Sequence, residues 1–297
     1  MNFTFRQLRL FLALAETGSV SAAAKEMHVT QPTASMQLKE ISASVGLPLY
    51  EVIGKKVFLT DVGKSLAVTA REITQSLASF EQLTYATKEV TKGHLRITVV
   101  STAKYFMPRL IGSFCKRHPL IDVSLEILNR DGVLGRLRQN TDDLYIMSMP
   151  PDDVALMDKV LMPNPIVVIA ASSDVLARQS KVSLSDLKDR RFILREKGSG
   201  TRMAADQYFQ KKKFRADIRL ELGSNEAVKE SVAGGLGIGV ISQYALHGHQ
   251  KEHGVRVIQV DDFPLKSSWH LVYLAAKNLS PIALAFKDHI IQEINGK

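Results

Sequence analysis

The sequence predicts a small α-helical domain, a long helix and an α/β domain of two lobes, in that order along the chain. Three observations predict this arrangement. Apolar residues recur at helical spacing through the first 45 residues, a coiled-coil spacing follows from residue 61, and short apolar strands alternate with helical patterns after Gly93. A length of 297 residues allows about two domains, which agrees with the change of pattern near residue 93.

Three short helices open the chain, because apolar residues repeat every three or four positions. Gly18 ends the first helix, Ser19 or Ser21 caps the second, and Thr30 caps the third before Gly46 ends it. Small residues at 22–24 allow another helix to approach closely. The apolar positions are Leu8, Phe11, Leu12, Ala15, Val20, Ala23, Ala24, Met27, Ala34, Leu38, Ile41 and Val45.

The second and third helices, 19–29 and 30–45, are joined by a tight turn at His28 and Val29, which is the spacing of a helix-turn-helix motif. In that motif the second helix enters the major groove of DNA, and side chains near its start meet base edges. The alternative is a helical bundle whose polar surface has no such role. The candidate DNA-contacting residues on these helices are Ser21, Thr30, Gln31, Pro32, Thr33, Ser35, Met36, Gln37 and Lys39.

A hairpin and a long helix follow. Residues 47–60 predict two short strands around a turn near Gly54, with Lys55 and Lys56 placed to contact phosphate or the minor groove as a wing. The domain at 1–60 is therefore predicted to be a winged helix-turn-helix. Residues 61–92 predict a linker helix that pairs with a second copy of the chain, because its apolar positions alternate spacings of four and three. These positions are Leu66, Ala70, Ile73, Leu77 and Phe80.

Residues 93–297 predict a mostly parallel sheet with crossover helices, in two lobes. Lobe I comprises 93–162 and 269–297, and lobe II comprises 163–268. The chain passes from one lobe to the other at 162–165 and returns over 262–269. Strands are expected at 95–101, 123–128, 144–149, 165–171, 192–196, 219–223, 237–242, 255–260 and 269–275, and helices near 104–117, 131–139, 202–213, 224–234 and 280–295.

Composition excludes several classes of protein. With 45% hydrophobic and 23% charged residues the chain can bury a core, so it is not intrinsically disordered. The single cysteine, Cys115, allows no internal disulfide. The apolar run at 166–171 is far too short to span a bilayer, and charged residues at 6, 9 and 16 interrupt any secretory signal, so we expect a cytoplasmic protein without membrane contact.

The net charge of +9 lies mostly in the C-terminal domain. Residues 1–60 have a net charge of +2, residues 61–92 are neutral, and residues 93–297 hold the remaining +7. Total charge alone would therefore point away from the helix-turn-helix as the DNA-binding part.

Several motifs do not carry a function. GGLGIG (234–239) has the wrong glycine spacing for dinucleotide binding and precedes a strand, so it is read as backbone packing. His247, His249 and His253 lack a cysteine or acidic partner at ligand spacing, so no metal site is expected. Cys115 is read as a helix-packing residue in preference to a reactive thiol. No nucleophile, base and acid occur together in a convincing context, so we expect no enzyme.

The motifs of residues 22–63 carry a family resemblance. An alanine-rich helix is followed by TQP (30–32), GLPLYE (46–51) and LTDVG (59–63), in the order typical of LysR-type transcriptional regulators. The resemblance extends over the whole chain. It implies a two-lobed effector domain of the periplasmic-binding-protein type, a homodimer or pair of dimers on dyad-related DNA sites, RNA polymerase as a partner, and a switch operated by a small molecule. Met36 departs from the family, in which many members have arginine there; methionine makes only apolar contact, for instance with a thymine methyl.

A narrower resemblance concerns the effector domain. The segments at 99–119, 147–151, 194–209 and 222–242, together with Met36, are similar to LysR-type regulators of carbon-dioxide-fixation operons. That resemblance implies a sugar phosphate or a nucleotide as effector, with no tightly bound cofactor. The alternatives are a LysR-type regulator of another pathway with a carboxylate effector, and a solute-binding module of a transport system, against which the helix-turn-helix argues.

The residues also indicate an anionic effector. Ser101, Thr102 and Lys104 follow a strand at the expected start of a helix, where backbone N–H groups attract anions. A glycine-containing loop follows another strand, and both segments fall at carboxyl ends of strands, where ligands bind in open α/β sheets. We expect these segments to hold an anion from both lobes. The remaining candidate residues are Gly198, Ser199, Gly200, Thr201, Arg202 and, for hydroxyl contacts, Asn225 and Glu226.

Overall fold

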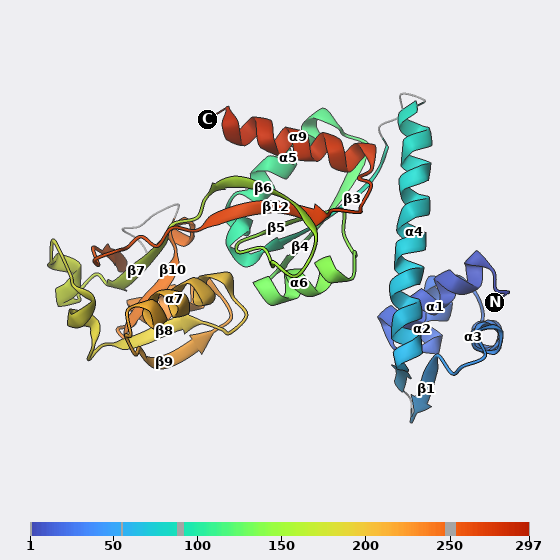
Figure 1. Ribbon diagram of the computed structural model, residues 1–297, viewed down its shortest axis with the longest axis horizontal. Coiled ribbons are helices and arrows are strands. Elements are labelled where there is room, and N and C mark those ends of the chain that lie inside the picture. The colour runs from blue at the N-terminus through green and yellow to red at the C-terminus, as the bar shows by residue number, and fades with distance from the viewer. Residues whose placement is uncertain (1, 55, 88–91, 247–253, 297) are drawn as a thin grey trace. The chain divides into compact units, whose positions relative to one another are not determined.

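The computed structural model describes residues 2–54, 56–87, 92–246 and 254–296. These residues form two compact units, one within 2–87 and the other within 92–296 (Figure 1). Each unit has its own hydrophobic core, and no buried residue belongs to both. Within the described residues no helix is long and apolar enough to cross a membrane.

The N-terminal unit begins with three helices packed around one core. Thr4 caps the first helix with a reciprocal capping box, Gly18 ends it at a positive φ of 64°, and Ser19 and Thr30 cap the next two with their hydroxyls. Leu38 and Ile41 of the third helix are fully buried against the first two. The elements are α1 (Phe5–Thr17), α2 (Val20–Glu26), α3 (Gln31–Val45), β1 (Tyr50–Ile53), β2 (Lys56–Leu59) and α4 (Asp61–Thr87).

The junction between the hairpin and α4 explains the LTDVG motif. The Thr60 hydroxyl donates to the Pro48 carbonyl (2.7 Å) and accepts from Gly63 N (3.0 Å), so it ties the start of α4 to the segment before β1. Gly63 lies so close to Leu49 that a Cβ at this position would stand 1.8 Å from the Leu49 carbonyl oxygen. Only glycine fits there, and the hairpin is thereby fixed beside the helices.

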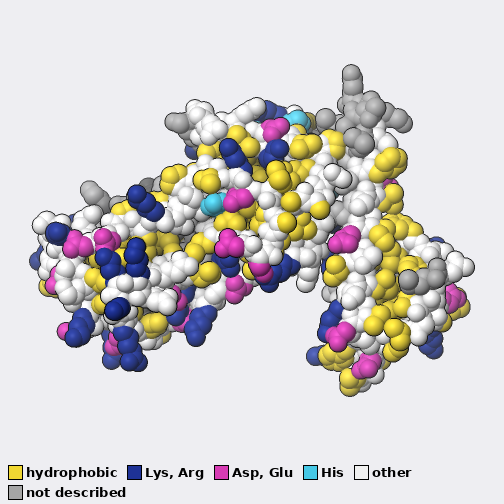
Figure 2. Space-filling model, viewed as in Figure 1, with side chains coloured by type: hydrophobic (Ala, Val, Ile, Leu, Met, Phe, Trp, Pro, Cys, Tyr) yellow, Lys and Arg dark blue, Asp and Glu magenta, His cyan; other side chains and the backbone are white. Residues whose placement is uncertain are grey.

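The apolar residues predicted to form the dimer seam of α4 lie in two environments, one buried within the N-terminal unit and one exposed. Ala70 is fully buried and Leu66 packs against the core of the three short helices, so the start of the seam belongs to this unit's own interior. Ile73, Leu77 and Phe80 remain exposed, Phe80 to 61%. Hydrophobic side chains are accordingly visible along α4 (Figure 2). The surface open to a partner helix is therefore shorter than the sequence indicated.

The C-terminal unit contains two five-stranded sheets, one in each lobe. The first has the order β4-β3-β5-β12-β6 and the second the order β11-β7-β10-β8-β9. The strands are β3 (Gly93–Val100), β4 (Ile121–Leu128), β5 (Leu144–Met147), β6 (Leu156–Pro163), β7 (Ile166–Ala171), β8 (Arg191–Arg195), β9 (Asp217–Leu222), β10 (Ile238–Ser242), β11 (Val255–Ile258) and β12 (Ser268–Leu274).

Helices cover both faces of each sheet. In the first lobe α5 and α9 lie on one side of the sheet and α6 on the other (Figure 1). In the second lobe α7 and α8 pack over separate clusters of buried residues. The bounds are α5 (Met107–Arg117), α6 (Arg130–Arg138), α7 (Gly200–Lys211), α8 (Asn225–Ala233) and α9 (Pro281–Asn295), with 3-10 turns η1 (Ser101–Tyr105), η2 (Val175–Arg178), η3 (Leu184–Leu187) and η4 (Gln243–Leu246).

The expectation of mostly parallel sheets was wrong. In each lobe three strands pair in parallel, and the other two add antiparallel pairs. The antiparallel pairs involve β6, β7 and β12, which lie next to the two segments where the chain crosses between the lobes. β6 was not predicted as a strand, because most of this edge strand is exposed and shows no apolar alternation.

The two passages between the lobes run side by side as a hinge. Asn164 N donates to the Ser267 carbonyl (2.8 Å), and Ile166 and Leu265 exchange backbone hydrogen bonds. The fully buried Asn164 side chain accepts a hydrogen bond from the Ser242 hydroxyl (2.6 Å). The hinge is therefore a two-stranded ribbon anchored in the second lobe.

The GGLGIG segment serves packing. A Cβ at Gly237 would stand 2.2 Å from the Arg191 carbonyl oxygen, and a Cβ at Gly239 would stand 2.9 Å from the side chains of Val228 and Val232. These glycines let β10 lie close to its neighbouring strand and to α8. The interpretation as backbone packing is thus supported by the contacts.

Candidate functional site

The exposed face of α3 holds the candidate DNA-contacting side chains. Gln31, Pro32 and Lys39 are exposed, Met36 is 55% exposed, and Ser35 and Gln37 are half-buried. The Thr30 hydroxyl caps α3 and lies 2.8 Å from the Thr33 hydroxyl, so both threonines have local partners. Ser21 is exposed at the start of α2. The helix therefore presents amides, a cation and one large apolar side chain on a single surface.

The hairpin extends this surface as a wing. Gly54 turns at a positive φ of 66°, and Lys56 at the start of β2 is exposed. Lys55 lies outside the described residues. A positive side chain beside a recognition helix can contact phosphate in a sequence-independent way.

The segment after β3 differs from the prediction. Ser101 to Tyr105 form a 3-10 turn, and α5 begins only at Met107, so no α-helix dipole stands behind Ser101 and Thr102. Phe106 has non-helical backbone angles (φ −128°, ψ −30°), and α5 begins after it with Pro108 in the first turn, where a missing N–H costs no hydrogen bond. Thr102 is buried and accepts a hydrogen bond from the indole of Trp269 (3.1 Å).

The glycine-containing loop lies at the start of α7, as predicted, and packs closely against the first lobe. A Cβ at Gly198 would stand 2.3 Å from Asp131 Oδ2, and a Cβ at Gly200 would stand 2.3 Å from the Ser148 hydroxyl. Ser199 and Thr201 are buried beside them. The two glycines therefore allow close contact between the lobes, to which α6 and the residue after β5 contribute.

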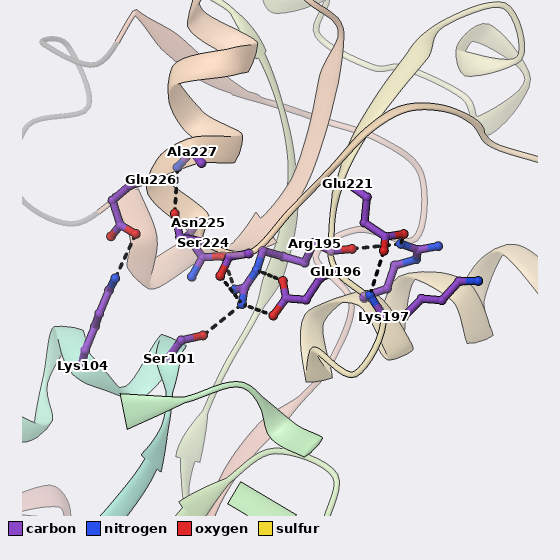
Figure 3. A network of polar contacts seen from close by, with 12 residues as sticks. Ser101, Lys104, Arg195, Glu196, Lys197, Glu221, Ser224, Asn225, Glu226 and Ala227 are labelled. Atoms are coloured by element: carbon purple, nitrogen blue, oxygen red, sulfur yellow. Dashed lines mark hydrogen bonds and ion pairs between the residues drawn. The ribbon is translucent and has the colours of Figure 1, made fainter. Parts of the chain in front are cut away.

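Arg195 is the main functional candidate that sequence reasoning missed. It ends β8 with only 1% of its surface exposed, and its guanidinium grips Glu196 through two hydrogen bonds (2.8 and 3.0 Å). It also donates to Asn225 Oδ1 (3.0 Å) and, across the lobes, to the Ser101 hydroxyl (3.1 Å) (Figure 3). A charged residue closing the apolar strand FILRE was the available signal.

A second contact between the lobes involves Lys104, Tyr105 and Glu226. Lys104 Nζ lies 2.9 Å from Glu226 Oε2 (Figure 3). The Tyr105 hydroxyl donates to Glu226 Oε1 (2.7 Å). Burial raises the pKa of Glu226, but the hydrogen bonds from Lys104 and Tyr105 outweigh burial and leave that pKa below its ordinary value. Glu226, predicted for hydroxyl contacts, is here the counterion of Lys104.

Arg202 and Asn225 differ in whether the donors of their buried side chains already have acceptors. Arg202 is buried and engaged within its own lobe by Asp206 (2.9 Å), Glu221 (2.6 Å) and the Arg195 carbonyl (2.9 Å). Asn225 Nδ2 is buried without a hydrogen-bond partner among the described residues. That amide lies near enough to the Tyr105 hydroxyl to oppose the rise in tyrosine pKa caused by burial. Asn225 Nδ2 thus lies by the Tyr105 hydroxyl without the geometry of a full hydrogen bond, which leaves it able to donate to a ligand oxygen.

Lys and Arg side chains gather over the lobe that carries α7, β8 and β9 (Figure 2). The described residues hold no group of three or more potential metal ligands, and His247, His249 and His253 lie outside them. Cys115 is half-buried on α5.

A helix-turn-helix with an exposed polar recognition face, followed in the same chain by an α/β domain whose two lobes meet through charged side chains, defines the class of DNA-binding regulators with a ligand domain. Residues 5–64 match the family model of the bacterial regulatory helix-turn-helix protein, lysR family, and residues 88–295 match that of the LysR substrate binding domain. The chain belongs to the LysR family of DNA-binding transcriptional regulators. The predicted fold class is confirmed.

The similar proteins confirm the narrower resemblance. The chain is 39% identical to the HTH-type transcriptional activator CmpR of Synechocystis sp., over 97% of this chain and 95% of that protein. It is 40% identical to the RuBisCO operon transcriptional regulator of Acidithiobacillus ferrooxidans, over 97% and 93%. The regulatory domain of Synechocystis PCC6803 CcmR, solved in complex with 2-PG, is 42% identical over 68% of this chain and 98% of that domain, with a TM-score of 0.67.

Proposed function

We propose that this regulator controls a carbon-dioxide-fixation operon and that a small phosphorylated anion, bound between the lobes of its C-terminal unit, alters its DNA contacts. The observation that carries the ligand site is the buried Asn225 beside Arg195 and Ser101, because its Nδ2 makes no hydrogen bond of full geometry among the described residues. The 42% identity to a regulatory domain crystallised with 2-PG, 2-phosphoglycolate, supports the ligand class.

The cations of the cleft are paired before any ligand arrives. Lys104 is held by Glu226, Arg195 by Glu196, and Arg202 by Asp206 and Glu221. An anion that enters must therefore displace a carboxylate or accept hydrogen bonds from donors that remain free. An anion that displaces the Glu226 carboxylate from Lys104 breaks a contact between the lobes. Ligand binding then favours one arrangement of the lobes over another, which is what a switch requires.

Calorimetric titration of the full chain tests the ligand. We expect 2-phosphoglycolate to bind and glycolate, its unphosphorylated counterpart, to bind at least tenfold more weakly. Ribulose bisphosphate, ATP and an aromatic carboxylate test the other anion classes. Asn225→Ala and Ser101→Ala should each weaken 2-phosphoglycolate, whereas Lys197→Ala, an exposed lysine of the same loop, should not. Equal affinity for glycolate would contradict a phosphate site.

The DNA contacts are proposed for the exposed face of α3 and for the wing. Gln31→Ala should weaken specific binding by about 1–3 kcal/mol, the range of a lost bidentate base contact. Lys56→Gln should make binding less dependent on salt, because fewer counterions are released. An equal loss on specific and random DNA would place Gln31 on the backbone only.

The assembly is proposed to be a homodimer, or a pair of dimers, that reads dyad-related sites and contacts RNA polymerase in the cytoplasm. The exposed apolar residues Ile73, Leu77 and Phe80 support pairing through α4. Leu77→Glu should shift sedimentation toward monomers, while Ser79→Glu, which lies on the same helix but off the seam, should not.

A regulator role without catalysis is favoured over the two other classes. The relatives are transcriptional regulators, and the helix-turn-helix is not needed by a solute-binding module. A LysR-type regulator of another pathway with a carboxylate effector stays the alternative, and binding of the aromatic carboxylate alone would favour it. No bound cofactor is proposed.

A further inference from the structure

A cavity lies beside the hinge of the C-terminal unit, apart from the residues proposed to hold the cleft ligand. This hinge cavity has a volume of about 440 Å³, within the range of about 300–1,000 Å³ that is usual for small-molecule sites. One wall is α7, which contributes positions 204, 207, 208 and 211, so a single face of that helix borders the cavity. The other wall is the return passage at 265–268.

The apolar part of the lining is held in place by contacts within the protein. Met149, which lines the cavity, has a φ of 53°, and the buried Arg130 donates two hydrogen bonds to its carbonyl oxygen (2.9 and 2.7 Å). The Tyr208 ring meets that of Phe263 edge-on, with centroids 5.1 Å apart, and its hydroxyl donates to the Asp261 carbonyl (3.3 Å). A ligand therefore meets a preformed apolar surface, which lowers the entropy cost of binding.

Two lysines of the lining are available to a ligand. Lys211 and Lys266 are exposed, and among the described residues neither makes an ion pair or a side-chain hydrogen bond. The carboxylate of Asp262 is engaged elsewhere, since its Oδ2 lies 2.7 Å from Lys212 Nζ. The hydrogen bond from Lys212, with a smaller effect of Lys211, keeps the pKa of Asp262 below its ordinary value. The cavity thus has an excess of positive charge.

We propose that the hinge cavity binds a divalent organic anion with a bulky apolar body. Lys211 from α7 and Lys266 from the return passage pair with its negative charges, while Met149 and Tyr208 pack against its body. The serine hydroxyls at 267–268 supply uncharged donors. A ligand as small as 2-phosphoglycolate would not fill this volume, so the hinge cavity and the cleft select different anions.

The hinge cavity is shared by the two lobes. α7 belongs to the second lobe, whereas Met149 and His270 belong to the first, where His270 Nδ1 lies 2.7 Å from Asp158 Oδ1. Ser148, the neighbour of Met149, is the residue whose hydroxyl a Cβ at Gly200 would approach to 2.3 Å. A ligand that holds α7 against Met149 therefore favours one arrangement of the lobes, so the cavity is a regulatory site outside the cleft.

Calorimetric titration of the full chain with naphthalene-2,6-dicarboxylate tests the site. We expect this dianion to bind, and its monomethyl ester, which has the same rings and one charge, to bind about fivefold more weakly. Lys211→Gln and Lys266→Gln should each weaken the dianion about fivefold and remove most of the difference between dianion and ester. Lys213→Gln, at an exposed position outside the lining, should leave both affinities unchanged.

A filling variant and a cleft variant supply independent arms. Ala204→Leu adds volume on the α7 wall and should weaken the dianion about tenfold or more, while circular dichroism shows an intact fold. Asn225→Ala removes a donor proposed for the cleft ligand and should leave the affinity for the dianion unchanged. Absence of binding at millimolar concentration, binding unchanged in both lysine variants, or binding that only Asn225→Ala abolishes would each overturn the proposal.

The effect on the cleft rests on the proposed function, whereas binding at the hinge cavity does not. With naphthalene-2,6-dicarboxylate at saturation, the affinity for 2-phosphoglycolate should change by about threefold or more. Lys266→Gln should reduce that change at the same concentration of dianion. If 2-phosphoglycolate fails to bind, the proposed function is wrong and the hinge cavity stands. If both ligands bind without affecting one another, the regulatory role of the cavity is wrong.

Discussion

Arg195 is only 1% exposed, and its guanidinium donates hydrogen bonds to Glu196 just after β8, to Asn225 of α8 and to Ser101 of η1. Arg195→Ala should lower the free energy of unfolding of the C-terminal unit by about 3 kcal/mol, because the Glu196 charge loses its partner in a mostly buried place. Urea denaturation followed by circular dichroism measures the change.

The matched variant is Arg191→Ala on the same strand. Arg191 pairs with Asp217, but both side chains are more than half exposed, so the loss should be within about 1 kcal/mol. Equal losses for Arg195→Ala and Arg191→Ala would show that burial does not strengthen the Arg195 contacts.

Lys277 gives the protein a predictable response to alkaline pH. Burial lowers the pKa of Lys277 from its ordinary 10.5 to about 8. Between these values the folded protein has released a proton that the unfolded chain still holds, so the free energy of unfolding should rise with pH from about 8 to 10.5. Denaturation of wild type and Lys277→Met across this range should show the difference between them growing with pH. Parallel curves would contradict a lowered pKa.

Contacts between individual side chains were the least predictable feature of the structure. Lys104 and Glu226 were both candidates, but their pairing joins residues 122 positions apart and has no trace in local spacing. Arg202 was expected to hold the ligand, yet the structure surrounds it with Asp206 and Glu221. Pairings of charges depend on the packing of whole elements, so the sequence could predict a charged cleft but not its ion pairs.

At the scale of elements, the start of α4 carries the sharpest prediction. Gly63→Ala should destabilise the N-terminal unit by about 1–3 kcal/mol or more, because the added Cβ would meet the Leu49 carbonyl oxygen and backbone must move. Gly112→Ala in α5 is the control, since nothing lies within 4 Å of its Cβ and alanine favours a helix. Thermal unfolding should show a lower midpoint for the first variant only.

Elements with strong patterns were predicted well and those without were not. The three N-terminal helices and the hairpin follow from apolar spacing, caps and Gly54, and the structure has them within a few residues. β6 was missed because an exposed edge strand leaves no alternation. The turn η1 was read as part of a helix because spacing alone does not distinguish a 3-10 turn from the first turn of α5.

At the scale of the whole molecule, the two units should unfold separately. Their cores share no buried residue, so calorimetry should show two transitions, and 2-phosphoglycolate should raise only that of the C-terminal unit. At 100 times the dissociation constant the ligand should add about 2.7 kcal/mol. Gly63→Ala should lower the other transition, which assigns the two. A single transition shifted by both changes would contradict independent units.

The overall architecture was the most predictable level. A change from helical spacing to alternating strands and helices separates the units, and the nine expected strands were enough for two lobes. The antiparallel pairing of β7 and β12 was not predictable, because it depends on the route of the chain through the hinge at 164–166 and 265–267.

The separate cores have an evolutionary consequence. Substitutions that change the ligand site lower the stability of only the unit that contains them. The bound metabolite can therefore change during evolution while operator recognition stays the same. A change of effector can thus evolve through substitutions in the C-terminal unit alone, while the protein continues to bind its operator.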